Sequence, residues 1–325
     1  MREDPILIVE NLKKYFPLGG GFLKKPTAQV KAVDGANLAV KRGETLALVG
    51  ESGCGKTTMG RCIVRLDEPT EGKIYFEKEN ILRYRGKGLR QLRRDMQVIF
   101  QDPFSSLNPR KTVEYIIGEG FVIHRLYSKR ECQERVSELM ELVGLRPELR
   151  GRYPHEFSGG QRQRICVARA IALHPKLVIA DEPVSALDVS IQAQILNLLV
   201  DLQEKLALTY LFISHDLSVV RHISNRVAVM YLGHIVEQAS REDLFKEPAH
   251  PYTEALMAAV PVADPFRKKH AIHLEGDVPS PLNPPSGCSF HPRCRYFQDV
   301  CRKTPPVMEE IDAGHEVACH FPRIK

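Results

Sequence analysis

The stretch Phe157-Ser158-Gly159-Gly160-Gln161 is the most informative part of this chain. Ser158 is a residue type preferred at the position before a helix, so we expect a helix to begin near Gln161. Gly159 and Gly160 allow another backbone or a ligand to approach closely. The N–H groups and the dipole at such a helix end favour anions. The stretch therefore predicts an anion site at a helix N-terminus.

A second anion site is predicted more than 100 residues earlier. Gly50 to Thr57 reads Gly-Glu-Ser-Gly-Cys-Gly-Lys-Thr, a full match to the Walker A phosphate loop. It follows a short apolar run, Thr45 to Val49, that predicts a strand, and a helix is expected after Lys56. We expect Lys56 to reach the β- and γ-phosphates of ATP and the Thr57 hydroxyl to bind Mg²⁺. The predicted nucleotide-binding residues of this loop are Gly50, Glu51, Ser52, Gly53, Cys54, Gly55, Lys56, Thr57 and Thr58.

An apolar run that ends in two acidic residues predicts the part of the nucleotide site that binds Mg²⁺ and the attacking water. Leu177 to Ala180 is followed by Asp181 and Glu182, and buried carboxylates at a strand end are costly unless a cation needs them. We expect Asp181 to hold the Mg²⁺ shell and Glu182 to act as the general base that polarises the attacking water.

The order of elements predicts an α/β fold with a largely parallel sheet. Strands are expected at Ile6 to Glu10, from about Val30, and at Tyr210 to Ile213, with a flexible basic loop at 19–26. Residues 113–150 have a helical pattern, in which Val136, Leu139, Met140 and Val143 form one apolar face. Near residue 260 prolines multiply, which predicts a linker and a separate small C-terminal module.

Together these motifs resemble the ATP-binding cassette (ABC) proteins, whose signature motif matches Ser158 to Gln161. The resemblance implies a P-loop domain at 1–258 with a mostly parallel sheet core, an antiparallel β subdomain and a helical subdomain at about 102–160. A small irregular extension is expected at 259–325. It also implies that Ser158, Gly159, Gly160 and Gln161 close on ATP held by another subunit, so that two cassettes enclose two ATP molecules. We therefore expect the isolated chain to bind ATP but to hydrolyse it slowly.

The resemblance assigns roles to four further positions. His215 stands where the family has a histidine that contacts the γ-phosphate and helps to orient the water. Gln101 stands where a glutamine contacts Mg²⁺ and the attacking water. Ser185 to Asp188 matches the D-loop that follows the acidic strand end. Phe16, or failing that Tyr15, stands where an aromatic ring stacks on adenine, although plain core packing of either ring is an open alternative.

The spacing of the motifs separates the types of ABC protein. Only 56 residues separate Gln101 from Ser158, and there is no second Walker A loop. This disfavours the chromosome-organising and translation-factor types, and favours a transporter ATPase subunit. Phe100 to Arg110 and His250 to Thr253 resemble the oligopeptide/dipeptide importers, most closely the second of their two ATPase subunits.

That resemblance implies four kinds of partner: a non-identical ATPase subunit, two transmembrane permeases, an extracytoplasmic binding protein and a peptide cargo. Nickel, glutathione or oligosaccharide as cargo, export, and a soluble ABC regulator or nucleic-acid ATPase are the alternatives.

The sequence predicts a chain that folds in the cytosol, and the importer resemblance implies a peripheral position at the cytoplasmic face of the cell membrane. It lacks a secretory signal at the N-terminus and an 18-residue apolar run, so we expect contact with the membrane only through partners. A net charge of +6 could suit nucleic acid or an anionic membrane surface, but in a chain this long it is more often the bias of a solvated surface, and we expect no nucleic-acid partner.

Four of the eight cysteines lie in the predicted C-terminal module. Cys288, Cys294, Cys301 and Cys319 are too widely spaced for the common zinc knuckles, and they match neither common ferredoxin pattern. A short proline-rich module with four thiols nevertheless suggests a metal staple. The importer family carries these cysteines, and the resemblance favours a [4Fe–4S] cluster. Zinc, free thiols and disulfides are the alternatives.

Overall fold

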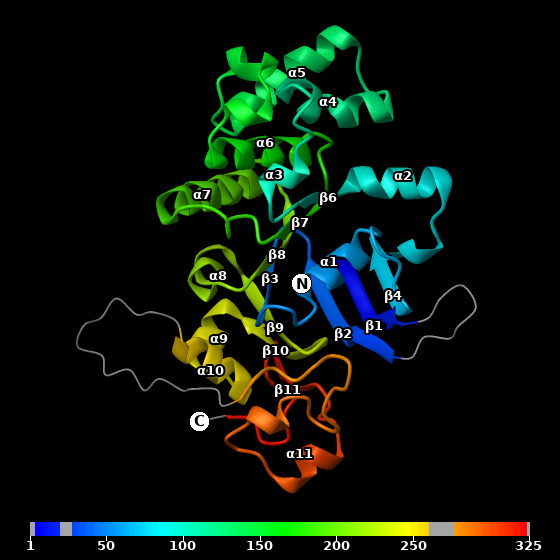
Figure 1. Cartoon of the computed structure of the whole chain (residues 1–325), viewed down its shortest axis with the longest axis vertical. Coiled ribbons are helices and arrows are strands. Elements are labelled where there is room, and N and C mark those ends of the chain that lie inside the picture. The colour runs from blue at the N-terminus through cyan, green and yellow to red at the C-terminus, as the bar shows by residue number, and fades with distance from the viewer. Residues whose placement is uncertain (1–3, 20–27, 260–275, 324–325) are drawn as a thin grey trace, which may run out of the picture. The chain divides into compact units, whose positions relative to one another are not determined.

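A computed structural model describes residues 4–19, 28–259 and 276–323. The chain divides into two compact units, the first made of Met1–Arg83 and Phe212–Lys325, the second of Tyr84–Leu211 (Figure 1). The linker predicted near residue 260, and all of the predicted basic loop except Gly19, lie outside the described residues.

An antiparallel sheet in the first unit has the strand order β2-β1-β4-β5. Its strands are β1 (Pro5–Leu18), β2 (Ala28–Lys41), β4 (Glu71–Phe76) and β5 (Glu79–Asn80). The predicted strand at Ile6 to Glu10 is too short, because β1 passes through an irregularity around Asn11, whose φ is 45°, and stays paired with β2 as far as Leu18. Bulges of this kind interrupt the alternating pattern that sequence reasoning follows.

A second sheet runs through the first unit in the order β11-β12-β10-β9-β3. The prediction of a strand at Thr45 to Val49 is confirmed by β3 (Thr45–Val49), which is buried throughout and pairs in parallel with β9 (Arg226–Tyr231). The remaining strands, β10 (His234–Ser240), β11 (Glu309–Asp312) and β12 (His315–Val317), are antiparallel. Through β12 the C-terminal residues extend this sheet, an arrangement that the sequence patterns did not show.

Short helices complete the first unit. The prediction of a helix after Lys56 is confirmed by α1, which follows the phosphate loop directly. The helical elements of this unit are α1 (Lys56–Ile63), η1 (Ile81–Arg83), α8 (Leu217–Ile223), α9 (Arg241–Lys246), α10 (Pro251–Ala259), η4 (His291–Arg293) and α11 (Asp299–Lys303).

The second unit is mostly helical and contains the parallel pair β6 (Met96–Ile99) and β7 (Leu177–Asp181). The predicted helical region at 113–150 is confirmed by α4, α5 and η2, and its predicted apolar face is buried. The chain passes into the first unit within β8 (Thr209–Ser214). The helical elements are α2 (Gly86–Asp95), α3 (Pro103–Ser106), α4 (Val113–His124), α5 (Lys129–Leu142), η2 (Pro147–Gly151), η3 (Pro154–Glu156), α6 (Gly159–Ile171) and α7 (Val189–Leu206).

These elements confirm the predicted α/β class. Parallel strand pairs occur in both units, and the antiparallel sheet is separate from them. The first glycine loop directly precedes α1, and Gly159 and Gly160 are the first two residues of α6, so the fold places two helix N-termini where anion sites are expected.

Candidate nucleotide site

The loop that starts at Gly50 requires glycine at both of its ends. Gly50 has a φ of 154°, and a Cβ there would stand 2.2 Å from the backbone oxygen of Met230. Gly55 has a φ of 108°, and its Cβ would stand 2.1 Å from the backbone oxygen of Ala32. Gly55 is also the N-cap of α1, where it has no side chain to occupy the helix end. The neighbouring strands therefore restrict the conformation of the loop. At the N-terminus of α1, backbone N–H groups and not a capping side chain face a possible ligand.

Lys56 is buried under the loop that it follows. Its Nζ donates hydrogen bonds to the backbone oxygens of Gly50 and Glu51 at 2.8 and 2.9 Å. Its side chain therefore curls around the phosphate loop and presents one positive charge there. A buried ammonium at a helix N-terminus is a strong anion-binding element.

Two residues that sequence reasoning did not assign to the site hold Glu51. The Glu51 N–H donates to the Tyr252 hydroxyl at 2.8 Å. The Glu51 carboxylate accepts two hydrogen bonds from Arg293, at 2.7 and 3.2 Å. Tyr252 belongs to the stretch that marked the importer type, and Arg293 precedes one of the four C-terminal cysteines. Those two patterns were visible in the sequence, but neither indicated the phosphate loop.

Of the two candidate adenine-stacking rings, Phe16 is the more accessible. The Phe16 side chain is exposed near the end of β1, with Lys14 Nζ 4.8 Å from its ring centroid. Tyr15 is partly buried, and its hydroxyl donates to Asp34 at 2.5 Å. Burial and this carboxylate raise the pKa of Tyr15, so its hydroxyl stays protonated. Phe16 is thus the better candidate for stacking because its side chain is exposed.

His215 lies at the end of β8, directly before the N-cap of α8. The side chain is exposed, and the next residue, Asp216, accepts hydrogen bonds from the N–H groups of Ser218 and Val219. The cap fixes the backbone beside His215. This is a suitable position for a histidine that reaches a ligand, and its role remains a prediction.

The second unit brings two of the predicted catalytic residues together. Gln101 Nε2 donates to Glu182 Oε2 at 2.8 Å. Glu182 follows the buried Asp181 at the end of β7, and its φ of 47° is unusual for a residue with a side chain. Such a conformation costs about 1–3 kcal/mol and is concentrated at functional sites. A carboxylate beside an amide, both at strand ends, is suited to hold and polarise a water molecule.

Ser158 is the N-cap of α6, as the sequence predicts. Its Oγ accepts from the Gln161 N–H at 3.3 Å, and its N–H donates to Gln161 Oε1 at 3.0 Å. Gly160 faces α7, and a Cβ there would stand 2.6 Å from Ile191 Cγ2. The predicted D-loop reaches from Ser185, whose Oγ donates to the Glu182 backbone oxygen at 3.0 Å, to Asp188, the N-cap of α7.

All four C-terminal cysteines line one small cavity of the first unit. Burial raises the pKa of the Cys288 thiol to about 11 and that of Cys319 to about 12, and the neighbouring cysteines add to both effects. Among the described residues, however, no three His, Cys, Asp or Glu side chains have the arrangement of a metal site. The structure therefore gives no support for the predicted cluster beyond gathering the thiols around one cavity.

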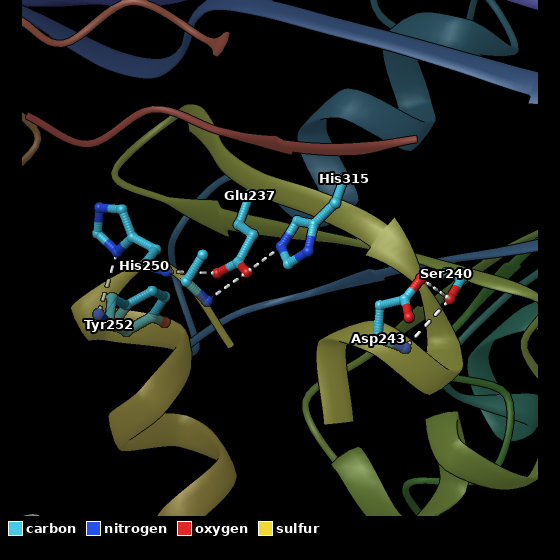
Figure 2. A network of polar contacts seen from close by, with 7 residues as sticks. Glu237, Ser240, Asp243, His250, Tyr252 and His315 are labelled. Carbon is cyan, nitrogen blue, oxygen red and sulfur yellow. Dashed lines mark hydrogen bonds and ion pairs between the residues drawn. The ribbon is translucent and has the colours of Figure 1, made fainter. Parts of the chain in front are cut away.

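A buried polar network joins the C-terminal residues to α10 (Figure 2). Glu237 on β10 is fully buried and accepts hydrogen bonds from His315 Nε2 at 2.7 Å and from the His250 N–H at 2.8 Å. His250 Nδ1 in turn accepts the Tyr252 N–H at 3.0 Å. The bond to Glu237 raises the pKa of His315, whereas burial lowers that of His250 to about 4. Tyr252 is therefore fixed from both its backbone and its hydroxyl.

No helix within residues 4–19, 28–259 and 276–323 combines the length and the apolar character needed to cross a bilayer.

Two family profiles match the sequence. Residues 33–185 match the ABC transporter family, and residues 236–301 match the family described as "Oligopeptide/dipeptide transporter, C-terminal region". The dimeric ABC cassette MJ0796, in a post-hydrolysis state bound to ADP and phosphate, has a TM-score of 0.64 and 28% identity over 72% of this chain and 98% of its own. CbiO1 of Clostridium perfringens, part of an ABC transporter complex, has the same TM-score and 30% identity over 75% of this chain and 92% of its own.

Curated relatives match almost the whole chain. The oligopeptide transport ATP-binding protein AppF of Bacillus subtilis is 54% identical over 98% of both chains. The dipeptide transport ATP-binding protein DppF of Haemophilus influenzae is 50% identical over 97% of this chain and 96% of its own. These matches confirm the predicted ABC fold and the importer-type resemblance. The chain therefore belongs to the ABC transporter ATP-binding proteins of the oligopeptide/dipeptide type.

Proposed function

We propose that this chain is the ATP-hydrolysing subunit of an ABC importer and that it drives the uptake of di- or oligopeptides through partner permeases. The observation that carries the proposal is 50–54% identity, over almost the whole chain, to oligopeptide and dipeptide transport ATP-binding proteins. The hydrogen bond between Gln101 and Glu182 supports the hydrolytic part, because it joins a water-orienting amide to a candidate base.

Each predicted residue has a role in the proposed reaction. Lys56 and the backbone of the phosphate loop bind the β- and γ-phosphates, and Phe16 stacks on adenine. Glu182 accepts the proton of the attacking water, while Gln101 and His215 orient that water. The hydroxyl of Thr57, the carboxylate of Asp181 and the amide oxygen of Gln101 are the hard oxygen donors that suit Mg²⁺. When bound, Mg²⁺ neutralises developing phosphate charge.

The signature residues Ser158 to Gln161 are proposed to complete the site of a second, non-identical ATPase subunit. Full hydrolysis then needs both subunits, because charge stabilisation supplied by a partner is worth ~10³–10⁵ in rate in related phosphate chemistry. The test mixes Lys56→Ala with Ser158→Arg. If the chain forms a homodimer, the mixture should regain activity that neither variant has alone. One site of the mixed dimer then combines the intact phosphate loop of Ser158→Arg with the intact signature of Lys56→Ala. Activity in the mixture would therefore overturn the non-identical partner, and an inactive mixture supports it.

The cargo, the two permeases, the extracytoplasmic binding protein and the position at the cytoplasmic face of the cell membrane are further parts of the proposal. A strain without this chain should fail to grow when a peptide is its only source of a required amino acid, and should grow normally on the free amino acid. The wild-type chain restores growth, and Glu182→Gln does not. Unimpaired peptide growth together with lost uptake of nickel, glutathione or an oligosaccharide would replace the peptide cargo with that compound.

We further propose that Cys288, Cys294, Cys301 and Cys319 hold a [4Fe–4S] cluster. Four soft thiolate donors around one cavity suit iron–sulfur or zinc, and metal binding offsets the raised pKa values of the buried thiols. When bound, the cluster would staple a module with little core of its own. Anaerobically purified protein should contain iron and absorb near 400 nm. Zinc without iron would favour the zinc alternative, and a metal-free sample with four reactive thiols would overturn both.

A further inference from the structure

Glu51, the second residue of the phosphate loop, is held by an arginine from the C-terminal part of the chain. Arg293 Nη1 and Nη2 donate to the two Glu51 carboxylate oxygens at 2.7 and 3.2 Å. The Arg293 side chain is only 7% exposed and that of Glu51 is 25% exposed. Two-pronged bonds between charged groups are stronger and more directional than neutral ones, and they gain strength away from water. The contact therefore fixes the orientation of Glu51.

The backbone of Glu51 is held from a second direction. The Tyr252 hydroxyl accepts the Glu51 N–H at 2.8 Å. Tyr252 is fully buried, and its ring packs against Tyr231 and Phe290 with centroids 4.7 and 5.4 Å away. Phe290 belongs to the same C-terminal segment as Arg293. The side chain and the backbone of Glu51 are thus held by one group of neighbouring residues, which includes Arg293, Tyr252 and Phe290.

Glu51 in turn contacts the residue that should bind phosphate. The Glu51 carbonyl accepts from Lys56 Nζ at 2.9 Å. The side chain, N–H and carbonyl of Glu51 each make a different contact. A displacement of Arg293 should therefore move Glu51, and through it the ammonium group of Lys56. Small displacements of this size matter at sites where charges must meet.

Arg293 ends a short turn between two of the four cysteines. The Cys288 N–H donates to the Cys301 backbone oxygen at 2.7 Å, and the Arg293 N–H donates to that of Phe290 at 3.0 Å. Cys294 follows immediately and lines the cysteine cavity. The conformation that aims Arg293 at the loop is therefore set by the packing of the cysteine segment.

We propose that Arg293 is a positioning residue for the phosphate loop and that, through it, the C-terminal cysteine module tunes the affinity for nucleotide. The inference rests on the proposed role of residues 50–58 as the phosphate loop. A purely architectural contact would fasten the module to the sheet without changing nucleotide binding, so the test must separate the two roles.

The module offers a matched control. Arg295 Nη2 pairs with Glu254 Oε1 at 2.9 Å on α10, so it makes an ion pair from the same segment to a helix of the same unit. Arg295→Ala therefore removes an anchoring contact without touching Glu51. Arg293→Lys keeps the charge but loses the two-pronged geometry.

The main experiment measures binding of a non-hydrolysable ATP analogue with Mg²⁺ by calorimetry, on full-length chains purified anaerobically. Arg293→Ala should raise Kd about tenfold, the scale of one lost charged hydrogen bond. Arg293→Lys should give an intermediate value, and Arg295→Ala should stay within about twofold of wild type. Glu51→Gln should add little to Arg293→Ala, since residues that act through one contact are not additive.

A reciprocal readout comes from amide hydrogen exchange of residues 286–303. Coupling between two sites acts equally in both directions. The analogue should slow exchange of this segment in the wild type and in Arg295→Ala, but not in Arg293→Ala. Thermal unfolding of each variant shows that the chains are folded at the assay temperature.

The outcomes separate this inference from the function on which it rests. Wild-type affinity in Arg293→Ala, or equal weakening in Arg293→Ala and Arg295→Ala, overturns the positioning role. Undiminished binding by Lys56→Ala would instead overturn the phosphate loop itself. Weak binding by Lys56→Ala together with normal binding by Arg293→Ala overturns only the positioning role of Arg293.

Discussion

The two glycine loops of this protein, at 50–55 and at 157–161, both open a helix, yet they are supported in different ways. The first is confined by residues far away in the sequence, among them Met230 and Arg293. The second is held by hydrogen bonds between Ser158 and Gln161, three residues apart, and by packing on Ile191.

The two loops therefore depend on the fold to different degrees. A loop enclosed by backbone atoms of distant strands keeps its shape only when those strands are in place. In a loop with a capping box, neighbouring side chains form hydrogen bonds with the free backbone N–H groups of the helix end, so the conformation of the loop is fixed locally. Substitutions in many parts of the first unit should therefore alter the conformation of the first loop. The conformation of the second loop should change only when its immediate neighbours are substituted.

The largest effect is expected from the charge that only the first loop carries. Lys56→Ala should lower ATP hydrolysis by the complete transporter about 10²–10³-fold, the scale of one preorganised donor at a developing charge. The exposed Lys73 provides the control, and Lys73→Ala should leave the rate unchanged. Steady-state phosphate release measures both. Retention of the wild-type rate by Lys56→Ala would remove this lysine from the site.

The glycines test the two kinds of support directly. Gly50→Ala should cost about 3 kcal/mol, because its Cβ meets a backbone oxygen at a positive φ. Gly160→Ala should cost about 1–2 kcal/mol, because its Cβ meets only the Ile191 side chain. Urea unfolding gives both values.

A second substitution sharpens the contrast between the glycines. Ile191→Ala should offset part of the Gly160→Ala loss, as neighbouring substitutions are not additive. Met230→Ala should give no relief to Gly50→Ala, because the obstacle is the Met230 backbone. Rescue of Gly50→Ala by Met230→Ala would show that the first loop is not confined by backbone.

The support of the first loop should also depend on pH. Burial holds the pKa of His250 at about 4 in the folded chain, below its usual 6.5, so the unfolded chain takes up a proton first as pH falls. Stability should therefore fall by on the order of 3 kcal/mol between pH 6.5 and 4. His315 has the opposite sign, because Glu237 raises its pKa. Its contribution is complete below pH 6.5 and is lost as pH rises through the raised value.

Two variants separate these contributions in urea unfolding across pH. His250→Asn keeps a hydrogen-bond acceptor for Tyr252 but does not titrate, so the acid-side slope should flatten. His315→Gln keeps a donor for Glu237 and should remove the loss at higher pH. An unchanged acid-side slope in His250→Asn would assign it to other groups. Ser158 and Gln161 do not titrate in this range, so the capping box of the second loop should be indifferent to pH.

The smallest effect on stability is expected at the cap of the second loop. Ser158→Ala should cost about 1 kcal/mol, while Ser158→Asp should cost little because aspartate is an equally good cap. If Ser158 faces the γ-phosphate held by a partner, Ser158→Asp should still abolish hydrolysis by the complete transporter through charge repulsion. Normal hydrolysis by Ser158→Asp would contradict that role.

The features that could be predicted from the amino-acid sequence are those with a local cause. The phosphate loop after β3, the cap of α6 and the acidic end of β7 each depend on residues within one short stretch. The spacing of glycine, lysine and capping residues predicts the same local structure in any globular chain, because that structure depends on backbone geometry and on hydrogen bonds between near neighbours.

The contacts between distant segments could not be predicted in this way and are seen only in the folded chain. The extension of β1 past Asn11, the pairing of β12 with β10, and the bonds of Glu51 with Arg293 join segments that no periodic pattern links. Glu51 and Arg293 are 242 positions apart. Neither residue shows in the sequence that it has a charged partner, and their contact depends on how the aromatic cluster around Tyr252 packs. The physical reason is that local propensity specifies an element, whereas packing of whole elements selects its partners.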